Sequence, residues 1–407
     1  MMGVKASCAD AAHSHSMSTA SRRRAYTGPI LFSYGFRPFF LGGAIWAAIT
    51  APLWVWSYLV GDGWLSREWH IHEMLFGALA AIVAGFLTTA VPNWTGRMPV
   101  IGAPLAGLFG LWVAGRLVML APGLSPMVSG TIDSAFLIVF AVVIWREVLA
   151  GRNWRNVPVC LLISLLALGN LVFHLRPDFW DTDIAWRVGI AAIALLIALI
   201  GGRIVPSFTN NWLKAQGQAP SARPESRFDH LVLLATAGAL AAWLVSPASL
   251  ISGSAMAAAG ALNLMRLARW SGWRTLKEPL VWILHVGYGW LALALGLLGL
   301  GVFVPGVPPT LGVHALTVGA VGVMTLAVMT RASRGHTGRA LAADRSVQLI
   351  YLLINLAALL RVSAAAGSLN PALLIASVIA WSLAFGLFAF THVPMLARPR
   401  PMVARQA

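Results

Sequence analysis

Long uncharged apolar runs recur along this chain, and they limit what it can fold into. A run of about 18 or more such residues can cross a lipid bilayer as a helix. Only 10% of the residues are charged, against about 25% in soluble domains. Almost no segment alternates with period two, which disfavours a barrel. The chain is therefore predicted to be an all-α polytopic membrane protein of about twelve transmembrane helices. The runs lie at roughly 38–60, 70–92, 101–121, 127–149, 157–175, 184–206, 230–246, 249–268, 280–304, 310–331, 347–366 and 371–396.

Basic residues gather on one side of the predicted membrane. With the N-terminus inside, 24 of the 29 Lys and Arg residues fall in inner loops and tails. This asymmetry sets orientation, so both termini are predicted to be cytoplasmic, and the +16 charge indicates contact with membrane lipid and not with nucleic acid. We expect a disordered cytoplasmic tail at 1–28, a single bundle at 29–400 and a cytoplasmic tail at 401–407. Residues 1–25 lack an apolar core, so no cleaved signal is expected.

Two stretches share one plan, with a histidine at one end and Thr-Gly-Arg at the other. At an offset of 242 residues, His72 meets His314 and 95–97 meets 337–339. A weaker third match, for which chance similarity is the alternative, ends at 205–206. The matches favour three repeats of four spans, roughly 38–149, 157–268 and 280–396, in a pseudo-threefold bundle.

The copied histidines, His72 and His314, are predicted to share a depth in the membrane. Imidazoles from two helices are natural axial ligands for haem iron, and hydrogen-bonded or interfacial histidines are the alternative. His70 points to nearly the opposite side of a regular helix from His72, so both cannot face one pocket. His70 with Met74 suits Cu(I), unless Met74 only fills space. Glu73 is a proton-relay or ligand-supporting candidate, or else a solvated surface charge.

Two further residues are candidates with open roles. His285 lies among aromatics in WILHVGYGW and is a ligand, a stacking partner or a packing residue. Arg339 belongs to a set of polar residues at the inner ends of the copied helices. Such a set can bind an anion or haem propionates, and positive-inside anchoring is the alternative.

Several motifs resemble the NnrS family, and together they span nearly the whole chain. The resemblance implies a twelve-span bacterial inner-membrane protein that contains haem and copper and relieves the toxicity of nitric oxide and nitrosyl-iron products. With two cysteines and no Cys-x-x-Cys-His motif, haem would be b-type and held non-covalently. The motifs are GFRPFFL (35–41), HIHEMLFG (70–77), AGFLTTAVPNWTGR (84–97), LHVGYGW (284–290) and the stretch 314–339. They fall on His72, Glu73, His285, His314 and Arg339.

The twelve-span plan also resembles the architecture of haem-copper oxidases. This sequence departs from them, because the sixth span has no histidine and the seventh has no adjacent pair. An oxidase-like binuclear centre is therefore not expected. The prediction is a haem and copper protein that binds or turns over nitric oxide, or relieves nitrosyl-iron damage. The alternatives are a transporter or exporter of a small metal or nitrosyl-iron complex without redox chemistry and, more weakly, a membrane scaffold.

Overall fold

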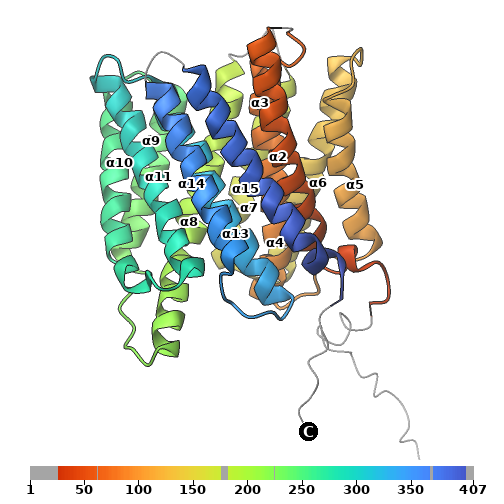
Figure 1. The fold of residues 1–407 in the computed structure, drawn as a ribbon, viewed down its shortest axis with the longest axis vertical. Coiled ribbons are helices and arrows are strands. Elements are labelled where there is room, and N and C mark those ends of the chain that lie inside the picture. The colour runs from red at the N-terminus through yellow and green to blue at the C-terminus, as the bar shows by residue number, and fades with distance from the viewer. Residues whose placement is uncertain (1–25, 62, 176–181, 224, 367–369, 400–407) are drawn as a thin grey trace, which may run out of the picture.

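The computed structural model describes residues 26–61, 63–175, 182–223, 225–366 and 370–399, and helices there stand side by side as one bundle (Figure 1). The predicted tails lie outside the described residues, apart from 26–28. The longer helices are α2 (Phe36–Val60), α4 (Ala80–Thr95), α5 (Ala103–Val118), α6 (Pro126–Ala150), α7 (Val157–His174), α8 (Thr182–Ala215), α9 (Arg227–Val245), α10 (Leu250–Ala268), α11 (Pro279–Phe303), α13 (Val323–His336), α14 (Arg345–Ala366) and α15 (Pro371–Ala397). The shorter elements are η1 (Ile30–Phe32), α3 (Arg67–His72), η2 (Glu73–Leu79), η3 (Trp154–Asn156), η4 (Gly272–Thr275), α12 (Pro309–His314) and η5 (Ala315–Gly322).

Eleven helices among the described residues are long and apolar enough to cross a membrane, counting α3–η2–α4 and α12–η5–α13 as one each. The chain is thus a polytopic α-helical membrane protein, as predicted. The remaining predicted run, 101–121, forms α5, which has only 16 residues. At about 1.5 Å per residue it is shorter than the roughly 30 Å hydrocarbon core.

Helix α5 nevertheless connects the two ends of the bundle. At one end, the backbone N–H of Gly102 donates to the carbonyl of Phe32 at 2.9 Å. At the other, Trp69 Nε1 donates to the carbonyl of Met119 at 3.0 Å. The chain therefore keeps alternating in direction through α5. The start of α2 and the end of α15 lie at the same end of the bundle, where Arg37 Nη1 donates to the carbonyl of Leu396 at 2.7 Å (Figure 1). We call this the terminal end and the opposite one the distal end.

The copied Thr-Gly-Arg motif ends a helix in both places. Gly96 and Gly338 have φ of 70° and 71°, the left-handed conformation that commonly follows a helix. The hydroxyl of Thr95 donates to the carbonyl of Val91 at 2.9 Å, and that of Thr337 donates to Ser333 at 2.7 Å. The motif is therefore a helix stop, while the threefold repeat stays a prediction.

Both copied helices change their winding directly after the histidine. The π-helical segment η2 follows His72, and the π-helical segment η5 follows His314. Such segments insert a residue into an α-helix and often occur at functional sites. Each one changes the direction in which the histidine points relative to the rest of its helix.

Candidate functional site

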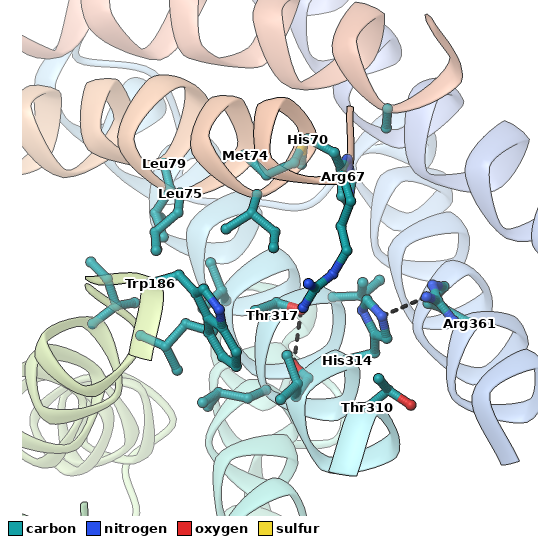
Figure 2. A pocket seen from close by; sticks show the side chains of 18 of the residues that line it. Arg67, His70, Met74, Leu75, Leu79, Trp186, Thr310, His314, Thr317 and Arg361 are labelled. Carbon is teal, nitrogen blue, oxygen red and sulfur yellow. Dashed lines mark hydrogen bonds between the residues drawn. The ribbon is translucent and has the colours of Figure 1, made fainter. Parts of the chain in front are cut away.

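A cavity of about 810 Å³ lies between the helices toward the distal end (Figure 2). Helices α2, α3–η2–α4, α8, α9, α11, α12–η5–α13, α14 and α15 line this central cavity. Its volume is within the roughly 300–1,000 Å³ of small-molecule and cofactor sites. Most lining side chains are apolar, and the few ionisable ones are Tyr58, Arg67, His70, Asp183, Arg187, His314 and Arg361.

His70 enters the central cavity from α3. Its ring stacks on Trp54, with centroids 4.2 Å apart and planes 22° apart. Nδ1 of His70 is buried without a hydrogen-bond partner among the described residues. Met74 lines the same cavity, and its sulfur accepts a hydrogen bond from Thr50 Oγ1 at 3.5 Å. The two residues predicted to suit Cu(I) therefore share one cavity.

His314 also lines the cavity, on the helix that faces His70 in Figure 2. Arg361 Nη2 from α14 donates to Nε2 of His314 at 2.5 Å. Because Nε2 accepts this bond, the neutral ring carries its proton on Nδ1. His314 is thus held in place by a cation that lines the same cavity.

His72 points away from the central cavity, and the structure does not bring it together with His314. Its side chain is 0% exposed and lies among α6 and α7. Two positions along an α-helix turn a side chain by about 200°, so one face of α3 presents His70 to the cavity and the other presents His72 to its neighbours. The cavity therefore holds His70 beside His314, where the sequence analysis expected His72.

The partners of His72 form a buried polar cluster. Its Nε2 lies 3.1 Å from Asp133 Oδ2, 3.0 Å from Asn170 Oδ1 and 3.1 Å from His174 Nε2. His174 Nε2 lies 2.9 Å from the same oxygen of Asp133. We call His72, Glu73, Arg116, Asp133, Asn170 and His174 the distal polar cluster. Two histidines and a carboxylate that converge in this way could hold a metal ion.

Glu73 belongs to this cluster and is not a solvated charge. It is fully buried, and its Oε1 lies 2.9 Å from Nδ1 of His72. Its Oε2 accepts hydrogen bonds from Trp46 Nε1 at 2.7 Å and Arg116 Nη1 at 2.6 Å. Arg116 also forms an ion pair with Asp133. The two carboxylates therefore share one guanidinium group in the interior.

Arg116, Asp133 and Asn170 were not among the site residues predicted from the sequence, and His174 had no predicted role. A signal for the first two was present, because each is an ionisable residue within a predicted apolar run. Such residues are functional candidates by default. His174 lies within the predicted run 157–175 and carried the same signal. For Asn170 the sequence carried no comparable signal, since its role depends on contacts between helices.

His285 and Arg339 lie outside both sites. Nε2 of His285 pairs with Thr209 Oγ1 at 2.9 Å, and its ring meets that of Trp270 edge-on. Arg339 Nη1 donates to Thr337 Oγ1 at 3.1 Å, beside the helix stop of α13. Nδ1 of His285 is buried without a hydrogen-bond partner among the described residues, so its role as a ligand, stacking partner or packing residue stays open, and Arg339 contacts a helix end.

Comparison with known proteins gives one family. A family model described as NnrS protein matches residues 30–400. No protein in a curated collection matches the chain.

Proposed function

Since the chain belongs to the NnrS family, as the match over residues 30–400 shows, we propose that it acts in the nitric-oxide response as a haem protein of the bacterial inner membrane. Its proposed partners are nitric oxide or nitrosyl-iron species. The observation that carries the haem proposal is the pair of imidazoles, His70 and His314, that line one cavity of about 810 Å³.

The residues of the central cavity fit a haem. Imidazoles on two helices are suitable iron ligands, and Nδ1 of His70 lacks any other described partner. The mainly apolar walls suit a porphyrin and exclude water. His70 and His314 would therefore hold the iron, in place of the predicted pair of His72 and His314.

Arginines at the cavity suit the charged part of the same group. Ligation through Nε2 of His314 requires Arg361 to release that atom, since the two are bonded at 2.5 Å. The guanidinium group of Arg361 would then be free to pair with a carboxylate such as a haem propionate. Arg67 lines the same cavity, where its Nη2 lies 3.8 Å from Asp183 Oδ1. When bound, haem supplies an iron centre for nitric oxide, and the chain holds and shields it.

Copper is part of the same proposal, and its first candidate ligands are His70 and Met74. Both line the central cavity, and an imidazole with a thioether suits Cu(I). His70 cannot serve haem iron and copper through one atom, so the two uses compete. Metal analysis of His70→Ala and Met74→Leu separates them, because only the copper use predicts metal loss in both variants.

The test of the haem proposal is the visible spectrum of full-length protein purified from haem-sufficient cells. Wild type is expected to show a Soret band, and His70→Ala and His314→Ala are expected to lose or shift it. His72→Ala should leave the band in place, whereas it would lose or shift the band if His72 and His314 were the iron ligands. His230→Ala is the matched control, since His230 is 63% exposed and outside the cavity. A wild type without Soret absorbance, or unchanged spectra in both cavity variants, would overturn the proposal.

Transport is the second candidate function. The two helices that bring His70 and His314 to the cavity are both interrupted by π-helical segments. Interrupted helices line the binding sites of many transporters. Uptake of a nitrosyl-iron complex into proteoliposomes of metal-free protein would favour transport, and haem-dependent binding without uptake would favour the first proposal.

A further inference from the structure

We propose that His72, Asp133 and His174 form a binding site for one divalent first-row transition-metal ion, separate from the central cavity. The site lies in the distal polar cluster, with ligands from α3, α6 and α7. It does not depend on the haem proposal, because it shares no residue with the central cavity.

The distances between the donor atoms suit a metal ion. His72 Nε2, His174 Nε2 and Asp133 Oδ2 lie 2.9–3.1 Å from one another. Bonds of about 2.1 Å at right angles would place neighbouring donors about 3.0 Å apart. Three donors at this spacing correspond to one face of an octahedron, the arrangement of two-histidine, one-carboxylate metal sites.

The surrounding hydrogen bonds direct lone pairs toward the centre of the site. Glu73 accepts from Nδ1 of His72, which leaves a lone pair on Nε2 of the neutral ring. Asn170 donates through Nδ2 to Asp133 at 2.9 Å, so its Oδ1 is turned toward His72. Nε2 of His72 therefore faces an amide oxygen and a carboxylate oxygen, neither of which can donate. A cation between these atoms satisfies all of them.

The charge balance of the cluster also calls for a cation. With neutral imidazoles, the carboxylates of Glu73 and Asp133 exceed the single guanidinium of Arg116 by one negative charge. All three side chains are at most 3% exposed. An uncompensated charge in such an interior is costly, and a bound metal ion or an added proton removes it.

Two glycines allow the ligands to sit this close to the neighbouring helices. A Cβ atom at Gly115 would lie 2.8 Å from Asp133 Oδ1, and one at Gly130 would lie 2.8 Å from Cβ of His174. These distances are too short for carbon in contact with either atom. Glycine at these two positions on α5 and α6 therefore leaves the space that the side chains of Asp133 and His174 occupy. His174 is the most exposed of the three ligands, with 11% of its side chain accessible at the distal end of α7.

The donor set decides the class of ion. Two imidazoles and one carboxylate suit zinc, copper(II) or iron(II), while the lack of thiolate and thioether among the three disfavours copper(I). Glu73 would act as the carboxylate that orients His72, as is common for metal-bound histidines. It is a positioning residue, since it touches the ring and not the site.

The experiment uses chelator-treated full-length protein and adds Zn²⁺, Co²⁺ or Cu²⁺ singly. After desalting, mass spectrometry of the elements is expected to show one tightly held ion per wild-type chain. His174→Gln, at the partly exposed edge of the site, should lose that ion, and Asp133→Asn provides a second variant. Glu73→Gln should weaken affinity about 10–100-fold and alter the visible bands of bound Co²⁺. His230→Gln is the matched control and should keep the ion.

Two results would overturn this site. If wild type retains none of the three ions, and also no Fe²⁺ added without oxygen, a proton is the cation of the cluster. If His174→Gln and Asp133→Asn both retain as much ion as wild type, the ion lies elsewhere. His70→Ala separates the two proposals, because it should lose the haem spectrum and still hold this ion.

Discussion

Arg116 forms ion pairs with two buried carboxylates at once, Glu73 and Asp133. Its side chain is 3% exposed on α5, and it reaches Glu73 on η2 and Asp133 on α6. Carboxylates inside a membrane bundle are costly unless they are paired and hydrogen-bonded. The packing of three helices at the distal end therefore depends on one guanidinium group.

Arg116→Met is expected to lower the free energy of unfolding by about 3–5 kcal/mol, because it leaves buried charge without a partner. The matched control is Arg97→Met. Arg97 is 41% exposed, and its partner Glu147 keeps an ion pair with Arg146 at 2.7 Å. The control should cost no more than about 1 kcal/mol. Unfolding in mixed micelles measures both, and equal losses would contradict the role given to Arg116.

At the scale of single residues, the sequence marked residues that line the cavity or the distal polar cluster, but it did not show which residues each of them contacts. It marked His70, His72, Glu73 and His314, and it showed that His70 and His72 face opposite ways. Which of them faces a cavity depends on Asp133 and the more distant His174, through contacts that spacing along one helix does not contain. For this reason the structure places His72 and His314 in different surroundings, and only His314 lines the central cavity.

At the scale of helices, the stop after α13 depends on one glycine. Gly338→Ala places a side chain at φ 71° and is expected to cost about 1–2 kcal/mol. The matched control is Gly335→Ala, inside α13. There the new Cβ would meet only Leu341 Cδ2, at 3.7 Å, so the change should be neutral or stabilise by up to about 1 kcal/mol. Thermal unfolding compares the two, and equal destabilisation would contradict the helix-stop assignment.

The apolar runs predicted most helices well, because spanning length and lack of charge are properties of the sequence alone. Helix α5 (Ala103–Val118) is shorter than the predicted run 101–121, because residues 119–121 lie beyond the end of the helix. The π-helical segments η2 and η5 could not be foreseen. A single inserted residue leaves no mark in a run in which nearly every position is apolar, and its position is set by packing against other helices.

At the scale of the whole molecule, the charge asymmetry predicts that the terminal end faces the cytoplasm. In a Cys8→Ser background, a membrane-impermeant maleimide applied to spheroplasts should label Leu124→Cys and not Gln216→Cys. Leu124 lies in the loop between α5 and α6 at the distal end, and Gln216 follows α8 at the terminal end; both positions are exposed. The remaining native thiol, Cys160, is buried and serves as the internal blank. Reversed labelling would overturn the proposed orientation.

The short helix α3 presents His70 to the central cavity on one face and His72 to the distal polar cluster on the other. A ligand that moved His70 further into the cavity by rotating α3 would also shift His72 relative to Asp133 and His174, which it contacts at 3.1 Å. We therefore expect the two sites to be coupled through the one turn of backbone that carries both histidines.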